Sequence, residues 1–193
     1  MTGRSRSAAA GAHDAPDPDL DDVRAAQADR AAFGALYRRY LDRVYGYCYY
    51  LLGDHHDAED VTERTFVAAL AAIDGFRDEG ATFRAWLFRI AHNQLANALR
   101  TRGRQRVARL DAVPELRATA DPLAALTRDE DARRVRHALS LLLDDRRQVL
   151  VLRFVDGLST DEIGQVLGRS AGAVRVLQHR ALRDLADRLD ATD

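Results

Sequence analysis

The residues that could carry chemistry fall into three groups, and the first is acidic. Asp57, Asp60 and Glu63 follow one another at three-residue steps, so a helix would place their carboxylates on one face. Such a face can bind a basic partner surface. It also suits a solvated helix start, because carboxylates stabilise the N-terminal end of the helix dipole. Glu59 and Glu63 could instead share a metal ion, although no histidine or further carboxylate motif completes such a site.

The second group combines aromatic and polar side chains between residues 83 and 100. Phe83 and Trp86 recur with other apolar residues at helical spacing, and we expect them in a protein core rather than in a base-stacking platform. The polar members are candidates for contact with nucleic acid, because such side chains can bond phosphates and base edges. These polar candidates are Arg84, Arg89, His92, Asn93, Asn97 and Arg100.

The third group has the pattern of a helix-turn-helix. Ser159 and Glu162 have capping-box spacing at the start of a short helix, Gly168 marks a turn, and Ser170 can cap the next helix. The second helix would lie in the DNA major groove, with backbone N–H groups of its first turn available to a phosphate. Its candidate DNA contacts are Ser170, Ala171, Gly172, Arg175, Gln178, His179, Arg180 and Arg183. A surface helical hairpin with solvated charges is the alternative.

Helices must position these groups, because apolar residues recur at three- and four-residue steps through most of the chain. The pattern predicts an all-α protein with two small helical domains joined by a flexible linker. Within the N-terminal extension we expect disorder up to about Asp19 and a helix from about Leu20. The predicted boundaries are 1–28 for a disordered N-terminal extension, 29–103 for the first domain, 104–127 for the linker, 128–187 for the second domain and 188–193 for a tail.

Composition narrows the class of protein further. The 193 residues are 47% hydrophobic and 31% charged, with a net charge of -1, so the location of charge matters more than its sum. The single cysteine, Cys48, excludes an internal disulfide. No apolar stretch approaches the roughly 20 residues that span a bilayer, and the N-terminus lacks a signal-peptide core. We therefore expect a cytoplasmic protein that binds no membrane.

Through the motifs of its two halves, the chain resembles the extracytoplasmic-function (ECF) sigma factors of the sigma-70 family, over roughly residues 29–187. The C-terminal half is similar to their region 4, through the segment Asp145-Arg-Arg-Gln-Val-Leu and the segment Gly157-Leu-Ser-Thr-Asp-Glu-Ile-Gly. The N-terminal half is similar to their region 2, through Asp57-Ala-Glu-Asp-Val-Thr-Glu and Phe83-Arg-Ala-Trp-Leu-Phe-Arg. Both motifs occur in the family's order and separation.

The resemblance implies a non-enzymatic transcription initiation factor without a cofactor or metal. Its partners would be core RNA polymerase, through the β′ clamp helices and the β flap, and promoter DNA; an anti-sigma factor is common in the family. Region 4 would read the -35 element through the third group, and region 2 would read the -10 element through the polar candidates of the second group together with Trp86. The residues implied for polymerase binding are Asp57, Asp60, Val61, Glu63 and Arg64.

Three positions depart from the family pattern. Glu63-Arg64 stands where Gln-Glu is frequent, which rearranges charge on the polymerase-binding face. Gly164 stands where alanine is usual; it permits close helix packing and weakens the helix by about 1 kcal/mol. Asp144 stands where proline is favoured, so we expect a different helix start there.

Geometry is compatible with a factor that reaches both promoter elements. The two elements lie about 54 Å apart at ~36 Å per turn, and a linker of about 25 residues extends to roughly 80 Å. The alternatives predict different behaviour. A dimeric helix-turn-helix regulator would bind a palindrome without polymerase, and an adaptor or anti-sigma-like protein would tolerate the loss of Arg175 and Arg180. A metal nuclease would show metal-dependent cleavage that needs Glu59 or Glu63.

Overall fold

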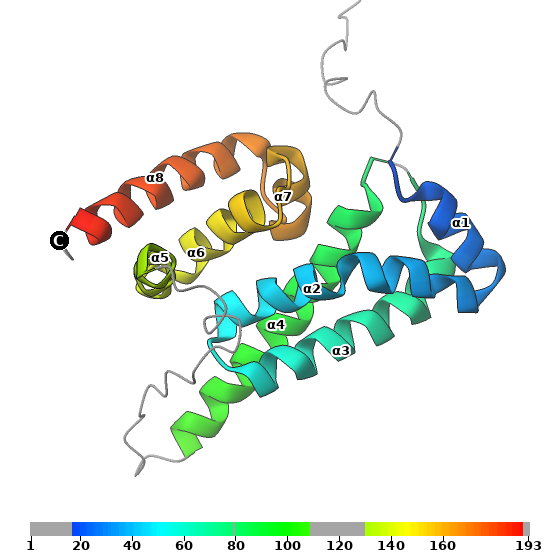
Figure 1. Cartoon of the computed structure of the whole chain (residues 1–193), viewed down its shortest axis with the longest axis horizontal. Helices are drawn as coiled ribbons and strands as arrows, with labels where there is room; N and C mark the ends of the chain where they lie inside the picture. The colour runs from blue at the N-terminus through cyan, green and yellow to red at the C-terminus, as the bar shows by residue number, and fades with distance from the viewer. Residues whose placement is uncertain (1–16, 79, 109–129, 191–193) are drawn as a thin grey trace, which may run out of the picture.

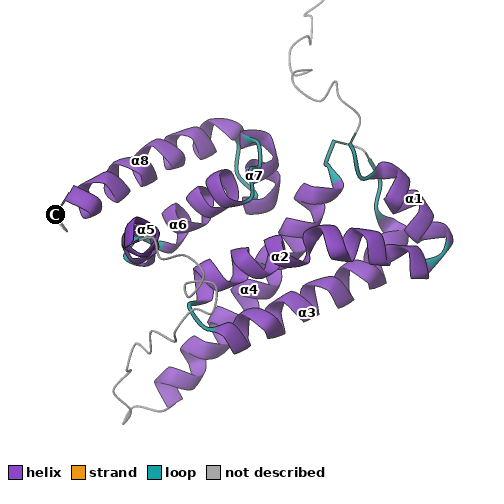
Figure 2. Cartoon of the chain, viewed as in Figure 1, coloured by secondary structure: helices purple, strands orange, loops and turns teal. Residues whose placement is uncertain are grey.

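The computed structural model describes residues 17–78, 80–108 and 130–190, and its regular elements there are helical (Figures 1 and 2). We call residues 17–108 the N-terminal module and residues 130–190 the C-terminal module. The N-terminal module contains α1 (Leu20–Ala28), η1 (Arg30–Ala32), α2 (Phe33–Leu52), α3 (His55–Ala72), η2 (Ile73–Gly75) and α4 (Phe83–Ala108). The C-terminal module contains α5 (Glu130–Ser140), α6 (Asp144–Leu150), the π-helical turn η3 (Val151–Val155), α7 (Thr160–Leu167) and α8 (Ala171–Asp190).

The core of the N-terminal module lies where α2, α3 and α4 pack together (Figure 1). Phe83 is fully buried at the start of α4. The rings of Tyr40, Phe76 and Trp86 surround it, with centroids 5.8, 5.9 and 5.5 Å from its own. The prediction that Phe83 belongs to the core is therefore confirmed, and its burial joins α4 to the helices on which it packs.

Local signals set the ends of these helices much as the sequence predicts. Gly53 ends α2 in the left-handed conformation, with φ of 67°, which glycine adopts at no steric cost. The Asp54 carboxylate accepts a hydrogen bond from the backbone N–H of Asp57 and caps α3, which begins at His55.

The segment before α2 is more ordered than predicted. The helix expected near Leu20 is present as α1, which packs against α2. The assignment of residues 17–28 to a disordered extension is wrong, because Asp17 and Asp19 are buried, with 8% and 1% of their surface exposed. Asp17 accepts a hydrogen bond from the backbone N–H of Phe83 at 2.5 Å, and Asp19 pairs with Arg39 and the Tyr40 hydroxyl. These partners are distant in the sequence, so composition could not indicate them.

The first residues of the predicted linker also differ from expectation. Helix α4 continues to Ala108, so residues 104–108 are helical rather than flexible. Arginine and glutamine are good helix formers, which explains why a helix can extend through this basic segment. The rest of the predicted linker, most of the predicted N-terminal extension (residues 1–16) and residues 191–193 lie outside the described residues.

The C-terminal module contains the predicted helix-turn-helix. The hydroxyl of Ser159 accepts from the backbone N–H of Glu162, and the Glu162 carboxylate accepts from the backbone N–H of Ser159 in return, so the capping box is confirmed. Gly168 makes the turn with φ of 65°. The Ser170 hydroxyl then accepts a hydrogen bond from Ala173 and caps α8. These local bonds determine where each helix of the motif begins, with the turn at Gly168 between them.

Two of the departures from the family pattern can now be placed. A Cβ atom on Gly164 would lie 2.7 Å from the backbone oxygen of Arg169, closer than real contacts allow. The glycine is therefore required by the close approach of the turn, an effect larger than the helix weakening that the sequence indicates. Helix α6 begins directly at Asp144 without a side-chain cap from Leu143, and Asp144 faces Arg147 at 3.6 Å.

The two modules contact each other directly. Helix α7 lies against α4, and η3 lies against α2 (Figure 1). Among the described residues, no helix is long and apolar enough to cross a membrane.

Candidate nucleic-acid and polymerase interfaces

The acidic face of α3 is largely open to solvent. The Asp60 side chain is 65% exposed and Glu63 is exposed, whereas Asp57 is half-buried and pairs with Arg102 of α4. Arg64 lies one turn beyond Asp60, with its guanidinium 3.3 Å from that carboxylate. The basic residue that departs from the family pattern thus partly neutralises the acidic face.

Val61 is not part of this surface. Its side chain is 2% exposed and belongs to the hydrophobic core. A buried valine cannot contact a partner in this arrangement, so its contribution is to fix α3 on the core and thereby to orient the acidic residues on either side. The sequence placed it in the polymerase-binding set only through the family resemblance.

Four of the polar candidates on α4 form an exposed line along the helix. Arg89, Asn93, Asn97 and Arg100 are spaced by four, four and three residues, and all four are exposed. The Arg100 guanidinium donates a hydrogen bond to the side-chain oxygen of Asn97. The opposite side of the helix is buried in the core, so these side chains are available to a partner without any rearrangement of the module.

The other α4 candidates are less accessible. Trp86 is half-buried and packs on Phe76, with ring centroids 5.4 Å apart. His92 is also half-buried, and its Nδ1 lies 3.4 Å from the Tyr47 hydroxyl. Burial lowers the pKa of His92, because the charged imidazolium loses solvation there. A neutral His92 would offer hydrogen bonds but no positive charge to a phosphate.

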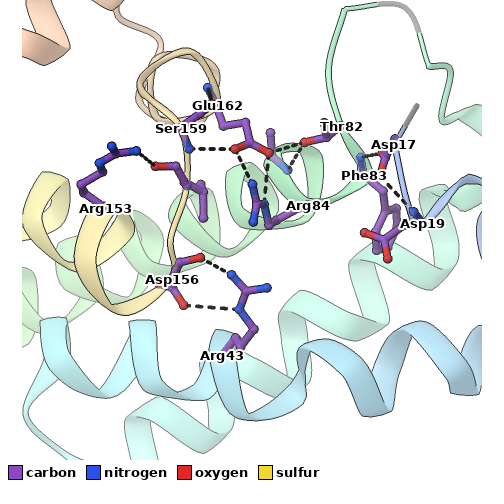
Figure 3. Close-up of polar contacts among 12 residues, drawn as sticks. Asp17, Asp19, Arg43, Thr82, Phe83, Arg84, Arg153, Asp156, Ser159 and Glu162 are labelled. Atoms are coloured by element: carbon purple, nitrogen blue, oxygen red, sulfur yellow. Dashed lines mark hydrogen bonds and ion pairs between the residues drawn. The ribbon is translucent and has the colours of Figure 1, made fainter. Parts of the chain in front are cut away.

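Arg84 is directed at the other module rather than at solvent. Its Nη2 and Nε donate to the two carboxylate oxygens of Glu162 at 2.6 and 3.1 Å, and the Thr82 hydroxyl donates to Glu162 at 2.7 Å (Figure 3). Burial alone would raise the pKa of Glu162, but these bonds and that from Ser159 outweigh it and lower the pKa to about 2. The carboxylate is thus ionised at any physiological pH and fully hydrogen-bonded.

Helix α8 presents the predicted recognition face to solvent. Val174 and Ala181 are buried against the rest of the module, which turns the opposite side of the helix outward. Gln178 is half-buried, and Ala171 at the first turn is partly covered. The exposed members of the predicted set are Ser170, Gly172, Arg175, His179, Arg180 and Arg183. The positive charge of the three arginines, and the paired donors of each guanidinium, suit phosphates and guanine edges in a major groove.

Another contact between the modules could not be predicted from the sequence. The Arg43 guanidinium of α2 donates to the backbone oxygen of Asp156, and its Nε lies 4.0 Å from the Asp156 carboxylate (Figure 3). Asp156 is 2% exposed, and burial raises its pKa to about 7. The Asp-Gly pair at 156–157 indicates a turn in the sequence, but nothing local indicates that this turn would meet α2.

The fold and these surfaces define an all-α DNA-binding protein with a helix-turn-helix in its second module. Two families match the chain: Sigma-70 region 2 over residues 36–105 and Sigma-70, region 4 over residues 132–185. The chain therefore belongs to the sigma-70 family, and its similarity to curated ECF RNA polymerase sigma factors assigns it to the ECF group within that family. It is a non-catalytic initiation factor that binds core RNA polymerase and promoter DNA and directs promoter-specific transcription.

Relatives and solved structures agree with this assignment. The ECF RNA polymerase sigma factor BldN of Streptomyces coelicolor is 36% identical over 182 residues, which cover 90% of this chain and 69% of that protein. The structure of CnrH in complex with the cytosolic domain of CnrY is similar at 30% identity, with a TM-score of 0.70 over 91% of this chain and 99% of that one. The sigma factor RpoE of Bartonella quintana, solved with the anti-sigma factor NepR, has a TM-score of 0.71 at 26% identity over 82% and 96% of the two chains.

Proposed function

We propose that three exposed helical faces divide the work of initiation. The acidic face of α3, with Asp57, Asp60 and Glu63, would bind the β′ clamp helices, and the adjacent Arg64 would lie beside this contact and reduce the charge of the face. The polar face of α4 would bind the -10 element, and the outer face of α8 would bind the -35 element. The observation that supports this division is that each helix buries one side in a core and leaves its predicted partner-binding polar residues largely outside.

We also propose functional boundaries for the two sigma regions. Residues 29–103 would form region 2 and residues 128–187 region 4, with 104–127 as the connection. The segment just before α1 adds structural support to the first region, since Asp17 and Asp19 bond to α4 and α2. The exposed apolar side chains of the C-terminal module suit a protein surface such as the β flap: Leu141, Leu143, Phe154 and Val155.

The central experiment adds purified chain to sigma-free core RNA polymerase and transcribes genomic fragments. We expect discrete transcripts whose upstream sequences share two elements about one and a half turns apart. Transcription no more specific than that of core polymerase alone would overturn the proposal. The same assay distinguishes a sigma factor from a helix-turn-helix regulator. The regulator would bind DNA without polymerase and would not start transcription with the core enzyme.

Recognition of the -35 element is tested by Arg175→Ala. Loss of one arginine at a base edge or phosphate should weaken promoter use by about 1–3 kcal/mol. Arg24→Ala is the matched control, because Arg24 is also an exposed arginine, on α1, where it pairs only weakly with Asp21 at 3.3 Å. Equal transcription by both variants would remove α8 from the interface, and a promoter altered at its -35 element should abolish the difference between them.

Polymerase binding is tested by Asp60→Ala. Removing an exposed carboxylate from a face that meets a basic surface should weaken binding to core polymerase, mainly by slowing association, and the loss should depend on salt. Asp21→Ala removes the same charge from α1, where the side chain is 98% exposed, and should leave binding unchanged. Core affinity can be measured by fluorescence anisotropy at two salt concentrations, and identical affinities of the two variants would contradict the assignment.

We propose further that an anti-sigma factor regulates the chain, since the similar sigma factor RpoE was solved in complex with the anti-sigma factor NepR. We also propose that the protein acts in the cytoplasm on the nucleoid. The test is purification of tagged chain from cells in which its promoters are silent. A stoichiometric partner that stops transcription when it is added back would support the proposal, and a chain that carries only core polymerase would contradict it.

A fluorescent fusion that does not colocalise with DNA would contradict the nucleoid assignment.

A further inference from the structure

One apolar side chain lies in the middle of the exposed face of α8. Val176 is 52% exposed, and its neighbours one turn before and one turn after, Gly172 and Arg180, are exposed as well. Helix α8 packs on α5, α6 and α7 with its other side (Figure 1). The predicted DNA contacts on this helix do not include the valine, so its role on the face needs a separate explanation.

Helical geometry places Val176 opposite the core. It lies two residues after the buried Val174, and two residues correspond to about 200° around a helix of 3.6 residues per turn. Leu182 is also an exposed apolar residue of α8, but it lies about a third of a turn away from Val176 around the helix axis. The two residues therefore do not form the contiguous apolar patch that a protein partner would need.

The surface beside Val176 is open enough for a base to approach. A Cβ atom on Gly172 would have its nearest neighbour, the Ser170 hydroxyl oxygen, 4.0 Å away, so the space one turn before the valine is not filled. Val176 lies in the second turn of α8, which begins at Ala171. The N-terminal part of a recognition helix is the part that contacts base edges, so this position would face the bases in a major groove.

The major-groove edges of the bases offer one group that matches such a valine. Those edges carry hydrogen-bond donors and acceptors, together with the C5-methyl group of thymine. A valine pressed against a donor or acceptor would leave it without a partner, which costs free energy once water is excluded. Against the thymine methyl, both groups leave water and apolar surface is buried. The side chain therefore favours an A·T pair over a G·C pair at the position that it faces.

We propose that Val176 determines part of the -35 specificity by contacting the C5-methyl group of one thymine. The inference rests on the proposed assignment of the outer face of α8 to the -35 element. Arg175 and Arg180, which flank the valine on this face, offer charge and hydrogen bonds to phosphates and guanine. Neither arginine has an apolar end for a methyl group, so the valine adds a base preference that the arginines do not supply.

Deoxyuridine isolates the methyl group, because it is thymidine without the C5-methyl and has the same hydrogen-bonding edge. The experiment measures the affinity of holoenzyme, formed from the chain and core polymerase, for a promoter fragment from the transcription experiment. Each thymine of its -35 element, on either strand, is replaced in turn by deoxyuridine. We expect one replacement to weaken the binding of wild type about fourfold, the value of one methyl-sized group removed from an apolar contact.

Val176→Ala should remove this sensitivity without unfolding α8, since alanine is the better helix former. The variant should bind the thymine promoter at least as weakly as wild type binds the deoxyuridine promoter, and it should bind the two promoters equally. Leu182→Ala is the matched control, because it also shortens an exposed apolar side chain of α8, on a different side of the helix. It should keep the wild-type response to deoxyuridine.

A gain of the methyl group provides the reverse measurement. With cytosine in place of the sensitive thymine, wild type should bind the promoter more tightly when that cytosine carries a 5-methyl group, and Val176→Ala should not respond to it. Three results would overturn the proposal: a -35 element without an A·T pair, no thymine whose methyl matters to wild type, or a methyl effect of the same size in wild type and Val176→Ala.

The proposed function fails in a different way. If Arg175→Ala and a promoter altered at its -35 element both leave binding unchanged, α8 does not read the -35 element, and the proposed function and the role of Val176 are overturned together. If Arg175→Ala weakens binding and no deoxyuridine replacement does, α8 keeps its assignment and only the role of Val176 is overturned.

Discussion

The predicted DNA-binding residues of the two modules are held in different ways. In the C-terminal module, Arg175, Arg180 and Arg183 of α8 are exposed. In the N-terminal module, only part of the predicted set is exposed, because Arg84 is bound to Glu162 and Trp86 packs in an aromatic cluster. Helical periodicity separates the core side of a helix from its outer side. It does not indicate which outer side chains a second module will occupy.

The largest effect on stability is expected from Phe83→Ala, which should destabilise the N-terminal module and not the C-terminal one. Phe83 is fully buried and contacts three aromatic rings, so its truncation should lower the free energy of unfolding by about 3–5 kcal/mol. The sole tryptophan, Trp86, reports on this module by fluorescence, whereas circular dichroism reports on both. Urea denaturation should show an early loss of the fluorescence signal. Val67→Ala, at a 62% exposed position, should leave both signals close to wild type.

The next effect concerns pH and the contact between the modules. Burial raises the pKa of Asp156 to about 7, against the opposing charges of Arg43 and Arg84, so the folded chain holds this proton more tightly than the unfolded chain does. The contribution of this proton to the stability of the folded chain is complete below the ordinary pKa of an aspartate. It is lost as pH rises through about 7. Tyr47 and Cys48 of α2 also face this charge, which helps to raise their pKa values.

A comparison of wild type with Asp156→Asn isolates this residue from other titrating groups, such as His92, whose lowered pKa acts in the opposite direction. The stability of wild type relative to the variant should fall by about 2 kcal/mol between pH 5 and pH 8. Urea denaturation at the two pH values measures it. A difference that does not change with pH would show that Asp156 remains accessible to water.

Gly164→Ala should affect the C-terminal module by a smaller amount. Alanine favours a helix over glycine by about 1 kcal/mol, but its Cβ would lie 2.7 Å from the Arg169 oxygen, so the turn must shift. We expect a net destabilisation of about 1–2 kcal/mol and weaker use of the -35 element. Thermal unfolding followed by circular dichroism tests this, with Gly46→Ala as a control, because a Cβ there has no neighbour within 4 Å. A stabilised Gly164→Ala would show that the turn adjusts freely.

The smallest effect is expected from Arg64→Ala. The pair with Asp60 is exposed on both sides, at 62% and 65%, so its loss should change stability by no more than about 0.5 kcal/mol. Because Arg64 partly neutralises Asp60, core polymerase should bind the variant at least as tightly as wild type. Weaker binding would show that Arg64 makes its own contact with the enzyme. The polymerase-binding face would then carry both acidic and basic contacts.

Local signals predicted much of this protein. The capping box of Ser159 and Glu162 and the helical start near Leu20 depend on residues within one or two turns, and the structure contains both of them. The candidate faces of α4 and α8 were accessible to prediction for the same reason, since a period of 3.6 residues determines which side chains share a side.

Distant partners account for the differences. Asp17 and Asp19 lie in a segment whose composition suggests disorder, yet each is buried by a residue 20 or more positions away. Val61 lies between the acidic residues in the sequence, but its side chain is buried in the core. Gly164 is required by the Arg169 carbonyl, whose close approach depends on the turn between two helices. In each case the decisive neighbour is set by packing.

The amino-acid sequence by itself determined the helices, the helix-turn-helix and membership of the sigma-70 family, because hydrophobic period, caps and motif spacing are encoded within short segments. Only the tertiary structure decided that Glu162 faces Arg84 and that Asp156 is buried against Arg43. Those pairs join residues 78 and 113 positions apart, and their burial depends on how two modules pack. No short-range pattern carries that information, since the burial that raises the pKa of Asp156 and the bonds from Arg84 and Thr82 that lower the pKa of Glu162 exist only once the modules meet.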